Sequence, residues 1–176
     1  VHGQQNLIQS FANSCNTSFA NLGLTLNIGS FTELLESMMF NQELPGSLSS
    51  TVSRFTLTDD AGTGKIMQTA FGQGDTLVSP LHMALVAAAV ENDGIVMTPY
   101  LVDHIQNDNG RTVRRYRSSE YGRIMSEEDA AILQEFMSAV VADGTATALS
   151  GQSYSAAGKT GSAEYDSEGN SHGWFV

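Results

Sequence analysis

The residues Gly158-Lys159-Thr160 are of the types that cradle a phosphate in nucleotide-binding loops. Such a loop also needs a glycine five residues before Gly158 and a helix that starts after the threonine. Position 153 is a serine, and the residues that follow Thr160 predict a strand ending in a polar turn. A phosphate-binding loop is therefore disfavoured, and nucleotide binding is a distant third hypothesis for this chain.

Two other patterns with chemical potential also fail on spacing. Gly72-Gln73-Gly74 lacks the third glycine of a dinucleotide-binding fingerprint, because Leu77 stands in its place. The four histidines and Cys15 show no metal-ligand spacing, so we expect no metal and no cofactor. His82 lies in an apolar segment and predicts a hydrogen-bonded core residue, and a structural role is also favoured for His172 over one in a cleft.

The combination that remains is Ser14-Cys15-Asn16 together with Lys159-Thr160-Gly161. Taken alone, Ser14 and Asn16 predict helix caps, Cys15 a small packing residue and Lys159 an exposed strand lysine. Their significance depends on the elements that carry them.

Hydrophobic residues spaced three and four apart predict a largely helical chain. A break is expected near Ser14, because Asn13, Ser14 and Asn16 suit a helix end better than a helix interior. Gly94 stops a buried, apolar helix that Ser79 and Pro80 begin. The predicted helices are residues 7–22 with that break, 30–39, 81–90 and 126–141. Helix 30–39 opens on a capping box of Ser30 and Glu33 and ends before Pro45-Gly46, and helix 126–141 ends before Gly144.

Two antiparallel hairpins complete the predicted fold, which is α/β of the α+β type. Residues 101–106 and 111–117 flank Asp108-Asn109-Gly110, which indicates a small surface hairpin with a two-residue type I′ turn. Residues 154–165 and 171–176 predict the second hairpin, joined by the polar turn 166–170. Residues 47–70 predict loop with one or two short strands.

Composition narrows the classes of function. The 176 residues carry a formal net charge of −11, which argues against nucleic-acid binding because phosphate contacts need a basic surface. Five of the eight basic residues lie between Arg111 and Arg123, which favours a solvated hairpin over a ligand patch. The chain has one cysteine, no apolar run long enough to span a membrane and no leader at Val1. Any anchor is therefore expected outside it.

Several segments, taken in order, resemble the transpeptidase domain of penicillin-binding proteins of the monofunctional, class B-like kind. These enzymes combine Ser-x-x-Lys, Ser-Asp-Asn and Lys-Thr-Gly motifs. In this chain Cys15 stands where the second motif has aspartate. The matching segments are Asn13 to Ala20, Gly72-Gln73-Gly74 with Ser79-Pro80-Leu81, Lys159 to Glu164, and Trp174-Phe175-Val176.

The resemblance implies serine acyl transfer on peptidoglycan stem peptides that end in D-alanyl-D-alanine, with β-lactams as inhibitors. It assigns catalytic roles to Ser14, Asn16 and Lys159. Ser14 relays a proton to the leaving group, Asn16 orients the substrate, and Lys159 supplies positive potential. The implied substrate-binding residues are Thr160 and Ser162, whose hydroxyls hold the substrate carboxylate, and Gly161, which lets the substrate lie along the strand; the Ser162 backbone N–H serves the oxyanion.

The chain departs from this family because none of its serines is followed three residues later by lysine. The nucleophile is expected upstream of Val1, so that residues 1–176 form a partial transpeptidase domain, truncated at both ends and inactive alone. The alternative is a non-catalytic peptidoglycan- or β-lactam-binding module or sensor. The parent is expected at the extracytoplasmic face of the bacterial membrane, with an anchor elsewhere, and residues 171–176 are expected to self-associate through an unpaired strand edge.

Overall fold

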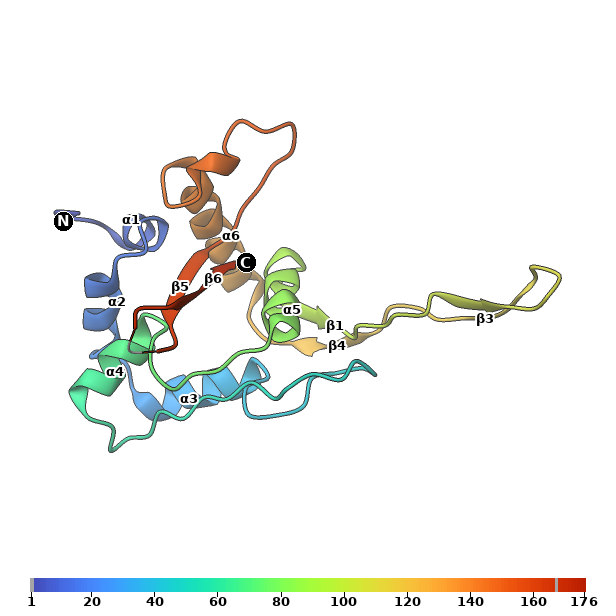
Figure 1. The fold of residues 1–176 in the computed structure, drawn as a ribbon, viewed down its shortest axis with the longest axis horizontal. Helices are drawn as coiled ribbons and strands as arrows, with labels where there is room; N and C mark the ends of the chain where they lie inside the picture. Colours follow the sequence, from blue (N-terminus) through green and yellow to red (C-terminus); the bar gives the residue numbers. More distant parts are fainter. Residues whose placement is uncertain (1, 167) are drawn as a thin grey trace.

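The computed structural model describes residues 2–166 and 168–176 (Figure 1). The described residues form helices and three separate antiparallel strand pairs, with runs of helices and runs of strands along the chain, which confirms the predicted α+β class. The helices are α1 (Leu7–Ala12), α2 (Asn16–Gly23), α3 (Ile28–Ser37), α4 (Thr63–Ala70), α5 (Pro80–Glu91), α6 (Glu127–Ala142) and the short 3₁₀ helix η1 (Thr147–Leu149). The strands are β1 (Ile95–Met97), β2 (His104–Gln106), β3 (Thr112–Arg115), β4 (Glu120–Arg123), β5 (Thr160–Glu164) and β6 (Ser171–Phe175).

Local cap chemistry places α5 and α6 as the sequence predicts. The Ser79 hydroxyl accepts the His82 backbone N–H at 3.2 Å, and the Ser126 hydroxyl accepts that of Asp129 at 3.0 Å. Helix α6 packs against α1 and α5, so it joins the beginning of the chain to its middle. None of the helices in residues 2–166 and 168–176 has the length and hydrophobicity that crossing a bilayer requires.

The predicted capping box at Ser30 and Glu33 is wrong. Helix α3 begins at Ile28, because Asn27 provides the same chemistry earlier and its side chain accepts the Ser30 N–H at 2.9 Å. The helix ends at Ser37, before Pro45-Gly46 as expected.

The prediction of loop and strand for residues 47–70 is also wrong in part. Residues 63–70 form α4, and the only strand-like pairing within 47–70 is the isolated bridge between Arg54 and Leu77. Helix α4 has no side-chain cap and packs on α2, so tertiary contact rather than local pattern determines it.

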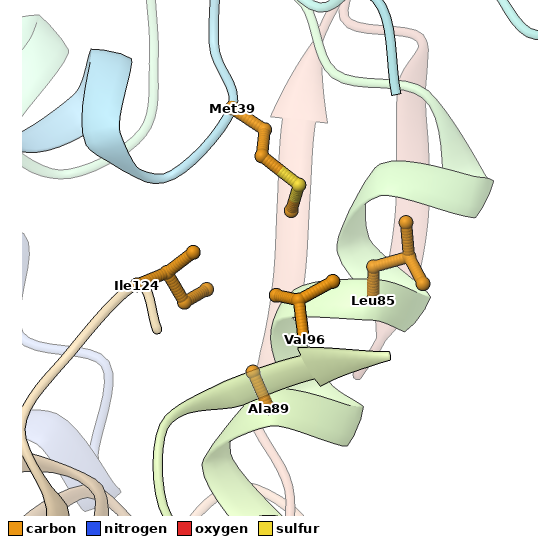
Figure 2. Packing of buried hydrophobic residues seen from close by; sticks show 5 residues of the cluster. All are labelled: Met39, Leu85, Ala89, Val96 and Ile124. Atoms are coloured by element: carbon orange, nitrogen blue, oxygen red, sulfur yellow. The ribbon is translucent and has the colours of Figure 1, made fainter. Parts of the chain in front are cut away.

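Figure 2 shows the core around α5, where Met39 and Ile124 point toward Leu85, Ala89 and Val96. All five side chains are buried, and Met39 reaches the cluster from a left-handed backbone conformation (φ 72°) just after α3. This packing holds α5 against the β1–β4 pair, which no sequence pattern predicted.

His82 has the predicted structural role. Its ring is buried, and Nε2 donates a hydrogen bond to the Met38 carbonyl at 2.7 Å. Burial lowers the pKa of His82, which keeps the imidazole neutral and its Nε2–H available as the donor.

The β2–β3 hairpin extends away from the rest of the chain, as Figure 1 shows, and every residue of β3 is exposed. The predicted type I′ turn is wrong, because only Gly110 of the pair Asn109-Gly110 has a positive φ. The Asn107 side chain accepts the N–H groups of Asn109 (3.2 Å) and Arg111 (2.9 Å) and so closes a three-residue loop that ends in a glycine bulge.

The second hairpin is confirmed, with its first strand shorter than predicted. β5 pairs with β6 in unbroken register from Thr160↔Phe175 to Glu164↔Ser171. The strand does not begin at Tyr154, because the Gly158 N–H donates instead to the Met137 carbonyl of α6 at 3.1 Å. Residue 167 of the predicted turn 166–170 lies outside the described residues.

Candidate active site

Ser14 lies in the joint between α1 and α2, where the sequence predicts a break. Its φ is 52°, a left-handed conformation that costs a serine roughly 1–3 kcal/mol. The Ser14 N–H donates to the Phe11 carbonyl at 3.1 Å, and the Cys15 N–H donates to the Ser10 carbonyl at 2.9 Å. The chain thus turns sharply at Ser14 and projects its hydroxyl from the joint.

Neither Ser14 nor Asn16 caps a helix, so that interpretation is wrong. The side chain of Asn6 caps α1, and the N-cap residue of α2 is Cys15, which makes no side-chain cap bond. Asn16 is the first residue of α2, and its side chain is exposed. Both polar side chains are therefore available for other partners.

Packing on both sides fixes the joint. The Phe11 ring lies 6.3 Å from that of Phe19 and 5.5 Å from that of Phe136 on α6, centroid to centroid. The hydroxyl of Ser10, which is buried, donates to the Ser18 hydroxyl at 3.0 Å across the joint. Rigid neighbours can hold the strained residue in place.

Lys159 reaches this joint from the other end of the chain. Its Nζ donates to the Ser14 hydroxyl oxygen at 2.9 Å and to the Thr160 carbonyl at 2.7 Å, and it lies 5.7 Å from the centre of the Phe11 ring. Reciprocal backbone bonds to Val176, at 2.8 and 3.1 Å, extend the β5–β6 ladder to Lys159. The structure therefore brings together two residues that are 145 positions apart.

Lys159 has a positive charge that no carboxylate neutralises among the residues that the structure describes. Its side chain is half-buried, and this burial lowers the pKa of the ammonium below its usual value. A partly desolvated ammonium without a carboxylate attracts an anion, because the Coulomb attraction between the two charges compensates for the solvation that the ammonium has lost. The Ser14 oxygen accepts from Lys159, which leaves the serine O–H free to donate.

The backbone of β5 presents polar groups along the edge that faces away from β6. Lys159 and Val176 exchange both hydrogen bonds, so the strict alternation of an antiparallel ladder turns the N–H and C=O of Thr160 and Ser162 outward. Lys159 occupies the Thr160 carbonyl, whereas Gly161 and Ser162 are exposed. An extended ligand can pair with this edge.

Two residues near β5 were not anticipated as contributors to the site. The Thr145 hydroxyl is hydrogen-bonded to the Thr160 hydroxyl, and the Gln73 side-chain amide donates to the Ser162 carbonyl at 3.4 Å. The Gly72-Gln73-Gly74 segment could have suggested Gln73, whereas no pattern marks Thr145.

The site therefore presents the Lys159 ammonium, the Ser14 hydroxyl and the open edge of β5. These groups suit recognition of an extended peptide with a terminal carboxylate. The sequence profile described as "Penicillin binding protein transpeptidase domain" matches residues 1–176. The chain belongs to this family. Family membership confirms the resemblance and the α+β fold, whereas the role of each residue stays a prediction.

A curated relative is similar along almost the whole chain. The chain is 29% identical over 175 residues to peptidoglycan D,D-transpeptidase PbpA of Mycolicibacterium smegmatis, covering 97% of this chain and 35% of the relative. It therefore spans about a third of that relative's length.

Two solved structures are similar in fold to this chain over almost its whole length. The D,D-transpeptidase domain of a peptidoglycan glycosyltransferase from Eggerthella lenta superposes with a TM-score of 0.86 at 30% identity, over 98% of this chain and 44% of that one. The imipenem acyl-enzyme complex of penicillin-binding protein A from M. tuberculosis gives a TM-score of 0.82 at 26% identity, over 97% and 38%.

The strain at Ser14 gives a testable prediction. Ser14→Gly is expected to have a free energy of unfolding about 1 kcal/mol higher than that of Ser14→Ala, because both variants lack the hydroxyl that accepts from Lys159 and only glycine adopts the left-handed conformation without a steric penalty. Chemical denaturation of the Ser14→Gly and Ser14→Ala variants measures this difference. Ser14→Ala is the matched control, since it also removes the hydroxyl but keeps the strain. Equal stability of the glycine and alanine variants would contradict the strain.

Proposed function

We propose that this chain is the part of a peptidoglycan D,D-transpeptidase that recognises the terminal carboxylate of its substrate. The whole protein then performs serine acyl transfer on stem peptides ending in D-alanyl-D-alanine, and β-lactams inhibit it. The observation that carries the proposal is the 2.9 Å hydrogen bond from Lys159 Nζ to the Ser14 hydroxyl. It joins the two family motifs at one place, beside an open strand edge.

The Lys159 ammonium binds the substrate carboxylate, helped by the hydroxyls of Thr160 and Ser162. Hydrogen bonds to charged groups of this kind contribute about 1.5–3 kcal/mol each. The substrate backbone lies along β5, where Gly161 leaves room for it. Its reacting carbonyl then meets the outward Ser162 N–H, one donor of an oxyanion hole.

The reaction needs a nucleophile that this chain does not supply, since none of its serines has a lysine three residues later. We place it in a Ser-x-x-Lys segment that precedes residues 1–176, which would then be a partial domain. As the serine oxygen bonds to the penultimate D-alanine carbonyl carbon, the lysine of that segment takes the serine proton, and the bond to the terminal D-alanine nitrogen breaks. The Ser14 hydroxyl passes its proton to this leaving amine and regains one from the same lysine, while Asn16 orients the substrate.

Labelling with a fluorescent penicillin tests this assignment. The full-length protein is expected to form one covalent adduct, which peptide mass spectrometry locates on a serine outside residues 1–176. The 176-residue chain alone is expected to form none. An adduct on a residue of this chain would contradict the location of the nucleophile.

A second candidate function is a non-catalytic module or sensor that binds peptidoglycan or β-lactams at the same open edge of β5. It is favoured by one observation, namely that Lys159 and Ser14 meet although no serine of residues 1–176 is followed three residues later by lysine. Saturable but non-covalent penicillin binding by the full-length protein, with no Ser-x-x-Lys in its sequence, would select this alternative.

Peptidoglycan stem peptides as partners imply work at the extracytoplasmic face of the bacterial membrane. We propose that the parent protein is anchored there by a segment outside residues 1–176. The acidic character of the chain agrees with a partner other than nucleic acid.

We also propose that the chain on its own self-associates through β6. Within the described residues β6 pairs with β5 alone, so its other edge is open. The ladder alternation turns the Gly173 N–H toward that edge. Gly173→Pro is therefore expected to shift a concentration-dependent dimer to monomer in sedimentation velocity, whereas a chain that stays monomeric at all concentrations would contradict the proposal.

A further inference from the structure

The Gly72-Gln73-Gly74 segment matches no nucleotide fingerprint, yet it touches the candidate site. The Gln73 Nε2 donates to the Ser162 carbonyl at 3.4 Å, and this contact joins positions 89 residues apart. Ser162 lies in the middle of β5, and its carbonyl faces the open edge of the strand. Gln73 is thus placed beside the backbone that the reacting carbonyl has to meet.

The backbone on both sides of Gln73 forms a turn that fixes the position of this residue. Gly72 and Gly74 have φ values of 85° and 96°, which residues other than glycine rarely adopt. The Gly72 N–H donates to the Thr69 carbonyl at 3.1 Å, and the Gln73 N–H to the Gln68 carbonyl at 2.9 Å. The end of α4 therefore fixes a turn with the glutamine at its centre.

Helix α4 in turn is fixed to the helix that follows Ser14. It packs against α2, and the approach is so close that a Cβ on Gly23 would overlap the Cβ of Ala70. A continuous chain of contacts thus runs from the Ser14 joint through α2 and α4 to Gln73, and from Gln73 to β5.

The two outward carbonyls nearest the site are each held by a side chain. Lys159 holds that of Thr160, and Gln73 holds that of Ser162. No strand pairs with this edge of β5 in residues 2–166 and 168–176, so these two side chains are the partners of the two outward carbonyls.

We propose that Gln73 is a positioning residue, which holds Ser162 so that its N–H keeps pointing toward the reacting carbonyl. Gln73 acts through the Ser162 backbone, and it neither exchanges a proton nor bonds the nucleophile. This inference rests on the proposed function. A hydrogen-bond donor that is already in place lowers the barrier more than one that must reorient during the reaction.

The test is the rate of acylation of the full-length protein, measured separately from the Kd of the preceding non-covalent complex. Gln73→Met keeps the volume of the side chain but cannot donate, and it is expected to slow acylation about tenfold, because small misplacements near a reacting atom have large effects. Penicillin G and imipenem should be slowed alike, since both present a β-lactam carbonyl to Ser162. The Kd and the Tm should change little.

Controls separate this role from others. Gln73→Glu has nearly the same shape and also lacks the donor, so it should be slowed at least as much, whereas Gln152→Met, at an exposed position, should behave as wild type. Faster acylation by penicillin G alone would show that Gln73 competes with the amide of that ligand, and would overturn the proposal. Unchanged rates with both β-lactams, or slowing that accompanies a lower Tm, would also overturn it.

A second measurement does not depend on transpeptidase activity. In the 176-residue chain, Gln73→Met is expected to shift the NMR signal of the Ala163 amide, which shares a peptide unit with the Ser162 carbonyl. The Gly161 amide faces β6 and should stay unchanged. If the wild-type protein is not acylated, the proposed function fails and this signal still decides the role of Gln73, because an unshifted Ala163 amide would exclude the contact.

Discussion

Lys159→Met is expected to lower the rate constant of acylation by carboxylate-bearing β-lactams at least ~100-fold, the loss of about two hydrogen bonds to a charged group. Methionine keeps an unbranched apolar stem beside Phe11 and removes only the ammonium. The Ser14 oxygen then loses its 2.9 Å donor, and the substrate carboxylate loses its cation. Stopped-flow kinetics on the full-length protein measures the effect.

Lys65→Met is the matched control. Lys65 pairs with Asp75 at 3.0 Å on the surface, and its removal should leave the acylation rate unchanged. If Lys159→Met acylates at the wild-type rate, Lys159 does not bind the carboxylate.

The same variant also has a pH signature in stability. Burial lowers the pKa of Lys159, so the folded state disfavours the charged form. This penalty is complete below the folded pKa and disappears as the pH rises past the unfolded value of 10.5. Wild type should therefore gain stability relative to Lys159→Met at alkaline pH, and the difference in Tm between the two proteins checks this.

Local signals were enough for much of the fold. Ser79 and Ser126 each stand directly before an amphipathic or apolar segment, and both cap helices as predicted. Asn13 to Asn16 marked the joint that carries Ser14. These predictions succeeded because a cap or a break depends on a few neighbouring residues.

The failures came where two local solutions compete or where distant contacts decide. Asn27 and Ser30 are both good caps, and sequence alone did not show that Asn27 would begin α3. Helix α4 has no side-chain cap and forms against α2, which periodicity within residues 63–70 does not reveal. The fold of a segment that depends on its partner cannot be read from that segment.

The candidate site divides in the same way. The meeting of Ser14 with Lys159 followed from the order of family motifs, because no local pattern relates residues 145 positions apart. Thr145 was missed, since a threonine after a helix end has no signature. Its hydroxyl reaches Thr160 because the end of α6 packs against the end of α1, and this contact also governs the stability of the joint.

Gly144→Ala is expected to destabilise the fold by about 3 kcal/mol, the upper part of the range for overpacking a core. An added Cβ would lie 2.8 Å from both the Ala12 carbonyl carbon and Val140 Cα, and closer still to the Ala12 oxygen. All three neighbours are backbone atoms, so no side chain can move aside. The Thr145 N–H, which donates to the same Ala12 oxygen at 3.1 Å, would be displaced as well.

Thermal denaturation of the chain measures this effect, and a loss of that size corresponds to a fall in Tm of about 6–12 °C for a protein of this length. Gly122→Ala is the control, because a Cβ there meets no atom within 4 Å, and its Tm should match wild type. In the full-length protein, Gly144→Ala should also slow acylation by β-lactams, because α1 ends at Ala12 and the Ser14 joint begins there. A Gly144→Ala protein with wild-type stability would show that α1 and α6 can separate without cost, and that Ser14 is held by other contacts.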